Sequence, residues 1–159
     1  MDTHAMLTAL DSLSNEPIKL VINSPGGELD SALLLYDLLR TLKSPVTTLG
    51  YFCASAAVFL LGAGQKRYLM PHSKVMLHLP WGEGRGDAKQ WDVIHREMAK
   101  YQEQVVSVLQ ECGAKRNREE ILEDIDREFW LEPQEVIDYG LADEIVTPKI
   151  MQEWLGGPR

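Results

Sequence analysis

Apolar residues follow two spacings that alternate along the chain. A mostly apolar run over 18–22 predicts a short strand, and apolar positions three or four residues apart over 29–42 predict an amphipathic helix. Because strands and helices continue to alternate, the pattern predicts an α/β fold with a largely parallel sheet. The other predicted elements are strands over 46–51, 67–70, 74–79, 128–131 and 141–146, and helices over 3–14, 54–61, 87–112, 133–139 and just after Asn117.

The longest predicted helix, over 87–112, carries an apolar seam along its whole length. Asp87 is a suitable N-cap for it, and Gly113 favours a helix stop. The pattern leaves two interpretations open, a core helix of a monomer or an assembly helix between subunits. The seam residues step by three and four, as in a coiled coil: Trp91, Ile94, Met98, Tyr101, Val105, Leu109 and Cys112.

Composition and charge narrow the class of protein. The 159 residues carry a formal net charge of −8 and no extended cluster of Lys or Arg, which argues against a nucleic-acid partner. The longest apolar run, over 53–64, is too short to span a membrane, and no signal peptide is visible. Cys53 and Cys112 are too few for a disulfide framework and do not form a metal-binding pair. We therefore expect a cytoplasmic protein with a single domain over 1–159.

Ser55 is a candidate nucleophile, because it lies near the start of the predicted helix over 54–61, among small side chains. A helix N-terminus offers unpaired N–H groups and a partial positive charge, and both stabilise the oxyanion that forms when a hydroxyl attacks a carbonyl. Taken alone, Ser55 is better explained as a helix N-cap.

A serine nucleophile needs a base nearby in space. His78 is the best candidate, because it ends an apolar strand just before a glycine-rich loop, and strand ends in α/β proteins commonly line the site. The other histidines lie in a predicted helix, a turn and a polar helix face: His4, His72 and His95.

The segment 124–128 supplies three candidate carboxylates that could orient the base: Asp124, Asp126 and Glu128. In an extended segment all three would point to one side, and their spacing does not choose among them. The turn over 24–27 lacks the residues of a phosphate-binding loop, and a backbone N–H donor for an oxyanion suits it better.

Several segments, taken in order and with their spacing, resemble the proteolytic subunit of the Clp protease, a peptidase of family S14 with the ClpP/crotonase-like fold. They lie over 22–27, 36–37, 54–64, 71–80, 126–129 and 135–143, and they include Asn23-Ser24-Pro25-Gly26-Gly27, Ala54-Ser55 and Val75-Met76-Leu77-His78. The resemblance implies an α/β fold with a stacked parallel sheet, surrounding helices and a protruding handle helix at about 87–112.

The resemblance also implies roles for single residues. It makes Ser55 the nucleophile and His78 the general base, with the N–H groups of Gly27 and Ala56 as the oxyanion hole. The family's third catalytic residue is an aspartate, and the matching position here is Glu128, which is chemically adequate; Asp126 could substitute for it. The segments 27–29 and 81–82 are expected to flank an extended peptide as strands, and no cofactor or metal is implied. The substrate-binding residues in or next to these segments are Gly26, Leu29, Trp81 and Gly82.

In the Clp family the long helix interlocks two seven-membered rings around a closed chamber, which an AAA+ unfoldase usually feeds. The resemblance therefore implies heptameric rings stacked as a tetradecamer, an AAA+ partner, and peptides or unfolded proteins as substrates. The chain departs from the family in Glu128, in the lead-in to Ser55 over 50–54, and in a late start without counterparts of the axial loop, first helix and first strand.

Three functions remain open. The first is a serine-type endopeptidase that works through an acyl-enzyme. The second is a catalytically impaired subunit that builds or regulates a ring, which the departures from the family favour. The third is an acyl-CoA enzyme of the related crotonase fold, which Ser55 and His78 at peptidase positions disfavour.

Overall fold

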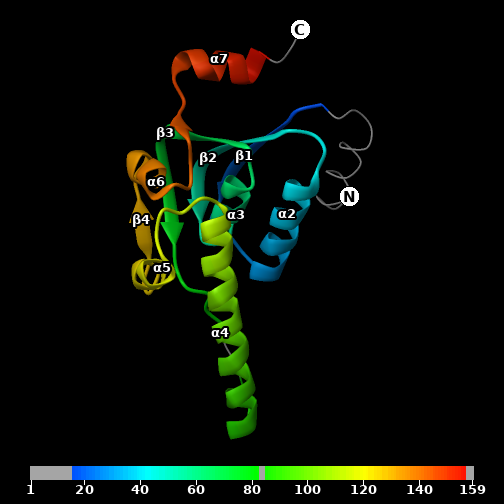
Figure 1. Ribbon diagram of the computed structural model, residues 1–159, viewed down its shortest axis with the longest axis vertical. Coiled ribbons are helices and arrows are strands. Elements are labelled where there is room, and N and C mark those ends of the chain that lie inside the picture. Colours follow the sequence, from blue (N-terminus) through cyan, green and yellow to red (C-terminus); the bar gives the residue numbers. More distant parts are fainter. Residues whose placement is uncertain (1–15, 83–84, 157–159) are drawn as a thin grey trace.

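The computed structural model describes residues 16–82 and 85–156, in which strands and helices alternate as the apolar spacing predicts (Figure 1). The predicted helix over 3–14 lies outside the described residues. The strands are β1 (Ile18–Ser24), β2 (Val46–Ala54), β3 (Lys66–Leu77), β4 (Phe129–Leu131) and β5 (Glu144–Ile145). The helices are α2 (Leu29–Thr41), α3 (Ala57–Gly62), α4 (Ala88–Glu111), α5 (Arg118–Asp124), α6 (Pro133–Tyr139) and α7 (Pro148–Gly156).

The strands β1, β2 and β3 run parallel and neighbour one another in that order. Their carboxyl ends therefore lie at the same edge of the sheet. β4 pairs antiparallel with the last residues of β3, and β5 pairs parallel with residues near the start of β3. The predicted α/β architecture with a largely parallel sheet is confirmed.

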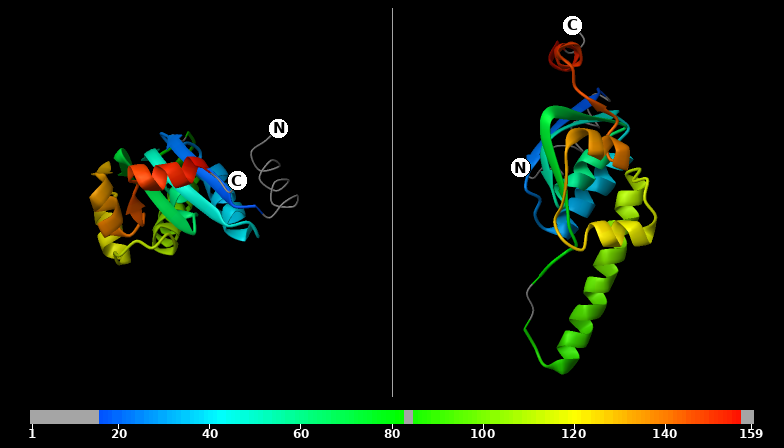
Figure 2. Two further views of the ribbon diagram at one scale, coloured as in Figure 1. Left: turned by 90° about the horizontal axis from the view of Figure 1, so that it is seen from above. Right: turned by 90° about the vertical axis from the view of Figure 1, so that its left-hand side faces the viewer.

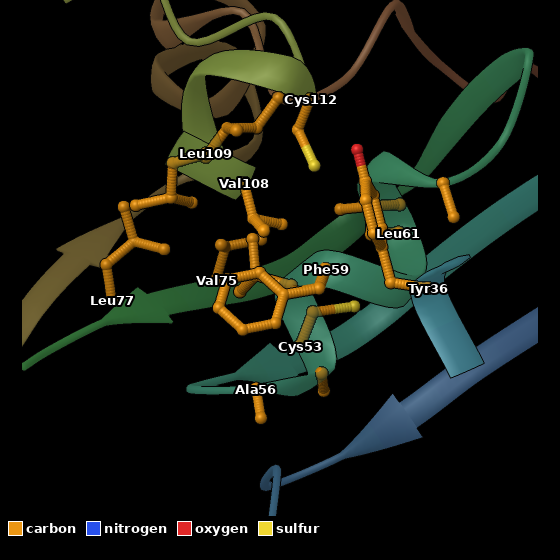
Figure 3. Packing of buried hydrophobic residues seen from close by; sticks show 14 of the residues in the cluster. Tyr36, Cys53, Ala56, Phe59, Leu61, Val75, Leu77, Val108, Leu109 and Cys112 are labelled. Carbon is orange, nitrogen blue, oxygen red and sulfur yellow. The ribbon is translucent and has the colours of Figure 1, made fainter. Parts of the chain in front are cut away.

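One cluster of buried apolar side chains joins the sheet to helices α2 to α6 (Figure 3). Phe59 of α3, Val75 of β3 and Leu109 of α4 meet near its centre. By contrast, α7 buries no residue and touches the sheet through its Trp154 ring, which packs edge-on against Tyr68. The core therefore lies between the sheet and the helices that precede α7.

Three strands are longer than the apolar pattern predicts, and β1 is one of them, since it continues beyond residue 22 to Ser24. The turn predicted over 71–73 is wrong, because these residues lie inside β3. The β2–β3 register shifts between Gly50 and Phe52, so β3 accommodates its additional residues as an irregularity and pairing then resumes. β2 continues to Ala54, so the predicted helix over 54–61 begins only at residue 57. Of the strand predicted over 141–146, only β5 forms, and the sequence did not predict helix α7.

The C-terminal half of the long helix α4 packs in the core, and its N-terminal half projects from the body of the protein (Figures 1 and 2). Asp87 caps it by accepting a hydrogen bond from the Gln90 N–H at 2.9 Å, as the sequence predicts. Its C-terminal turns bury four residues: Val105, Val106, Val108 and Leu109. Its N-terminal half extends beyond the body, where Trp91 and Val93 are 41% and 40% exposed. The core interpretation of the apolar seam therefore holds only for the C-terminal half.

α3 meets the end of α4 at Gly62. A Cβ added to Gly62 would lie 2.1 Å from Cys112 Sγ, much closer than non-bonded atoms approach. Both residues are buried, so little space is available for either to shift. The approach of the two helices therefore requires glycine at this position.

Gly62→Ala should lower the free energy of unfolding by about 1–3 kcal/mol, the usual cost of overpacking a filled core. Gly156→Ala is the matched control, because a Cβ at this helical glycine would have no neighbour within 4 Å. The control should leave stability unchanged or raise it by up to about 1 kcal/mol through helix propensity. Denaturant unfolding measures both, and equal stability of the two variants would contradict the close packing at Gly62.

Candidate active site

Ser55 lies in a strained turn between β2 and α3. Its φ is 56°, and among the described residues it is the only non-glycine residue with a positive φ. The Ser55 N–H donates to Met76 O at 2.7 Å, which continues the β2–β3 ladder by one step and fixes the backbone. The turn therefore places the Ser55 side chain at the carboxyl edge of the sheet.

The Ser55 hydroxyl and the His78 imidazole form a hydrogen-bonded pair, with 2.7 Å between Oγ and Nε2. His78 directly follows β3, and the next residue, Leu79, donates its N–H to Ile125 O at 2.9 Å, which fixes this segment. The interpretation of Ser55 as a helix N-cap is wrong, because Ala56 holds the cap position of α3 and no side chain caps that helix. The serine hydroxyl is engaged by the histidine instead.

The other histidines of the described residues are not part of this arrangement. His72 and His95 are exposed on β3 and α4, and neither lines the pocket beside Ser55. His4 lies outside the described residues. His78 is therefore the base candidate that the fold brings to Ser55.

A pocket of about 430 Å³ opens beside the Ser55–His78 pair. Gly82 is absent from its lining residues. Leu29 is the first residue of α2, so the prediction that it extends as a strand is wrong, and it contributes to the wall as a helical residue. The predicted site residues that line the pocket are Gly26, Gly27, Leu29, Ala56 and Trp81.

The apolar wall of the pocket was not predicted as part of the site. It consists of Phe59, Leu77, Val105 and Leu109, together with Pro25 and Pro80. Val105 and Leu109 belong to the apolar seam of the long helix, so the sequence indicates that they are buried. It does not indicate which buried residues border a cavity, because that depends on how α4 packs against α3.

The segments 26–27 and 55–56 lie against each other at the pocket. A Cβ added to Gly26 would lie 2.6 Å from Ala54 O, and the Gly26 φ of 94° also favours glycine. The N–H groups of Gly27 and Ala56 donate no hydrogen bond within the described part of the chain. Two free donors beside a nucleophilic hydroxyl are the arrangement that stabilises an oxyanion.

Only two of the three candidate carboxylates lie near His78. Asp126 and Glu128 border a hollow of about 350 Å³ together with His78. Asp124 instead ends α5 and accepts a hydrogen bond from the Tyr139 hydroxyl at 3.1 Å. The segment is therefore not extended throughout, and the condition under which all three side chains would share one side is not met.

Glu128 is hydrogen-bonded, but to Trp130 and not to His78. Its Oε2 accepts from Trp130 Nε1 at 3.1 Å. Asp126 pairs with Arg127, with 3.7 Å between Oδ2 and Nη1. Across the described ranges, no carboxylate is hydrogen-bonded to the His78 ring. The site thus contains a serine–histidine pair with an acid close by that is bonded elsewhere.

Cys53 precedes Ser55 by two residues and does not compete with it as a nucleophile. Burial raises the pKa of the Cys53 thiol to about 12. The thiol is therefore protonated at neutral pH, and a buried neutral thiol is unreactive.

The described residues contain no group of three or more His, Cys, Asp and Glu side chains arranged to hold a metal ion. None of the helices in the same part of the chain has both the length and the apolar character of a membrane span.

A side chain at φ 56° is strained, so removal of the Ser55 Cβ should stabilise the fold. We expect Ser55→Gly to be more stable than Ser55→Ala by about 1 kcal/mol, because both variants lose the hydroxyl but only alanine keeps the strained Cβ. Denaturant unfolding of the two variants measures the difference. A glycine variant that is no more stable than the alanine variant would show that the turn is unstrained.

The sequence matches the family profile described as Clp protease over residues 2–149. It is 36% identical over 132 residues to the ATP-dependent Clp protease proteolytic subunit 4, chloroplastic, of Arabidopsis thaliana, which covers 81% of this chain and 45% of the relative. It is 34% identical over 149 residues to the ATP-dependent Clp protease proteolytic subunit of Bacteroides thetaiotaomicron, which covers 91% of this chain and 67% of the relative. The chain thus spans about half the length of the plant relative and about two thirds of the bacterial one.

The structure is similar to that of a ClpP1 mutant from Listeria monocytogenes, with a TM-score of 0.83 and 29% sequence identity. The superposition covers 92% of this chain and 83% of that protein. The predicted ClpP-like fold is therefore confirmed. Because the family profile matches residues 2–149 of this chain, the chain belongs to the Clp protease family.

Proposed function

We propose that this chain is a serine-type endopeptidase that acts as the proteolytic subunit of a Clp-type protease. The observation that carries the proposal is the 2.7 Å contact between Ser55 Oγ and His78 Nε2 beside an apolar pocket. At this distance the imidazole can take the hydroxyl proton as the hydroxyl attacks a carbonyl. Family membership supports the same reaction, since the matched relatives are named proteolytic subunits.

In the proposed reaction His78 Nε2 accepts the Ser55 proton while Ser55 Oγ attacks the carbonyl carbon of the peptide bond. The carbonyl oxygen becomes an oxyanion, which the N–H groups of Gly27 and Ala56 stabilise. His78 then gives its proton to the leaving amine nitrogen as the C–N bond breaks, and an ester remains on Ser55. Water, deprotonated by His78, hydrolyses this ester and restores the free serine.

The proposed substrate is an extended peptide or an unfolded protein. Gly26, Trp81 and Gly82 are the proposed contacts for its backbone, and Leu29 belongs to the wall beside them. The apolar wall formed by α3 and α4 favours an apolar side chain at the residue before the cleaved bond. This specificity follows from the lining of the pocket and not from any single polar contact.

Glu128 is the proposed third residue of the site, with the role of orienting His78. Its bond to Trp130 favours a second candidate function, a catalytically impaired subunit that builds or regulates a ring. The two candidates share the fold and differ only in whether the acid reaches the histidine.

We also propose that the chain assembles into heptameric rings that stack as a tetradecamer, with an AAA+ unfoldase as partner. The projecting half of α4 exposes Trp91 and Val93, and Ile94 and Met98 are partly exposed beside them. An apolar surface on a projecting helix is the kind that contacts between subunits bury. The words ATP-dependent in the names of the matched relatives support an ATPase partner.

A cytoplasmic location and a single domain over 1–159 complete the proposal. Both cysteines of the described chain are free and buried, which fits a reducing compartment.

The purified protein should hydrolyse a short fluorogenic peptide, and Ser55→Ala should lower the rate by about 10³-fold or more, because the nucleophile is lost. Light scattering on the same samples gives the mass of the assembly. Unchanged turnover in Ser55→Ala would rule out the endopeptidase. A folded, assembled parent that neither turns over peptide nor reacts at Ser55 with a fluorophosphonate would establish the second candidate.

Peptides with leucine before the cleaved bond should have a kcat/KM about 10²-fold above otherwise identical peptides with aspartate there. The reason is that an unpaired carboxylate is costly to bury against Phe59, Val105 and Leu109. Competition between the two peptides in one reaction gives the ratio directly. Equal cleavage of both would show that this pocket does not receive the side chain.

A further inference from the structure

We propose that Trp130 is a positioning residue that holds Glu128 away from His78, so that the acid joins the histidine only when its bond to the indole breaks. The inference rests on the proposed function, because it concerns how the proposed acid reaches the proposed base. Glu128 Oε2 accepts a hydrogen bond from Trp130 Nε1 at 3.1 Å, and this bond has no part in the proposed reaction.

Glu128 neighbours two nitrogen donors, the indole of Trp130 and the imidazole of His78, which borders the same hollow. Extended by one step beyond its last pair, the β3–β4 register would bring His78 opposite Glu128. Opposite residues of an antiparallel pair have Cβ atoms about 4.5–5.5 Å apart and project from the same face. Glu128 and Trp130 also share this face, because they are two residues apart along the strand. The pairs that define the register are Val75 with Leu131, Met76 with Trp130 and Leu77 with Phe129.

The indole of Trp130 is held in place by the neighbouring strands. Its ring stacks on Phe52 of β2, with centroids 6.3 Å apart and an interplanar angle of 24°. Its backbone pairs with Met76 of β3. The indole N–H therefore donates to Glu128 from a ring that is stacked on one face, although 48% of Trp130 is exposed. Within the described residues the glutamate side chain has this hydrogen bond alone, so it is the partner that can change its position.

The hollow lined by the segments that follow β3 and precede β4 gives the Glu128 carboxylate room to move. It measures about 350 Å³, and the charged groups that border it with His78 are Asp126, Arg127 and Glu128. Glutamate has one methylene more than aspartate, so its carboxylate can reach a donor on its own strand as well as one on the opposite strand. The additional reach is what allows two alternative partners.

The two donors differ in charge at different stages of the reaction. The indole N–H is always neutral, whereas the His78 ring becomes a cation when it takes the Ser55 proton. A hydrogen bond accepted by a carboxylate is charge-assisted with either donor. The imidazolium adds the attraction between opposite charges, which the neutral indole lacks. The carboxylate is therefore held by Trp130 in the resting enzyme and is drawn to His78 as the imidazolium forms. Breaking the Trp130 bond adds to the barrier of that step.

Trp130→Phe removes the indole N–H and keeps an aromatic ring on Phe52. It should raise kcat/KM for a short peptide about two- to fivefold, the effect of freeing a carboxylate from one exposed hydrogen bond. In a Glu128→Gln background the same substitution should have no effect, because no carboxylate remains to be released. Trp154→Phe, at the opposite end of the sheet, is the matched control for loss of an indole.

The pH profile separates this role from a structural one. A carboxylate close to His78 stabilises the protonated ring, which cannot act as a base. The rise of kcat/KM on the acid side should therefore move to higher pH in Trp130→Phe and stay in place in Trp154→Phe. A lower or unchanged kcat/KM in Trp130→Phe, or an equal effect in the Glu128→Gln background, would overturn the proposal.

A second measurement does not depend on turnover. With 5-fluorotryptophan incorporated, the ¹⁹F resonance of Trp130 is assigned by its loss in Trp130→Phe, and Glu128→Ala gives its position without the acceptor. A peptide boronate forms a bond from boron to Ser55 Oγ and leaves the proton on His78, so it should move the resonance toward that position. No movement at full occupancy would overturn the proposal.

Failure of the proposed function gives a different result. A protein that neither hydrolyses peptide nor binds the boronate at Ser55 has no functioning serine–histidine pair, and both proposals then fall. A protein that does both, with Trp130→Phe indistinguishable from Trp154→Phe, retains the endopeptidase function and overturns only the role of Trp130.

Discussion

The parallel pairing of β2 with both β1 and β3 is the constraint on which the rest of the structure depends. It aligns three carboxyl ends, so that Ser24 pairs with Cys53, and Ala54 pairs with Met76. The segments that follow these ends carry the glycine turn, the serine and the histidine. A slip of one residue in the β2–β3 pairing would turn alternate side chains to the opposite face and separate Ser55 from His78, and a slip in the β1–β2 pairing would separate the glycine turn from Ser55. The register of the sheet, more than any contact between the side chains, therefore brings the site together.

Glycine residues allow the segments that the sheet aligns to pack closely against one another. Gly26 allows its turn to lie against Ala54, and Gly62 allows α3 to meet the end of α4. The wall of the pocket and the projecting half of α4 belong to one continuous helix, with Leu109 in the wall and Trp91 in the projection.

The sequence predicts the features that depend on spacing within one segment. The order of elements, the ends of α4 and the strand-end position of His78 all follow from local patterns. The continuous β3 was missed because only its pairing with β2 shows that Pro71 lies within a strand. The pocket wall was missed because burial of Val105 and Leu109 does not reveal the cavity that they border. The Trp130 bond was missed because it depends on where two side chains of a shared face point.

The acid shows why a position in a motif does not by itself define a role. An aspartate at residue 128 would have a shorter side chain. Its carboxylate would reach the indole of Trp130 less easily, so the Trp130 bond would compete less well with a bond to His78. In the proposed site, Trp130 gives the Glu128 carboxylate a second partner besides His78. Aspartate at this position would then have one arrangement, and glutamate has two. In this proposal the balance between the two arrangements depends on the charge on His78, which changes during the reaction, so the same pair of residues can hold the acid at rest and release it when the base is protonated.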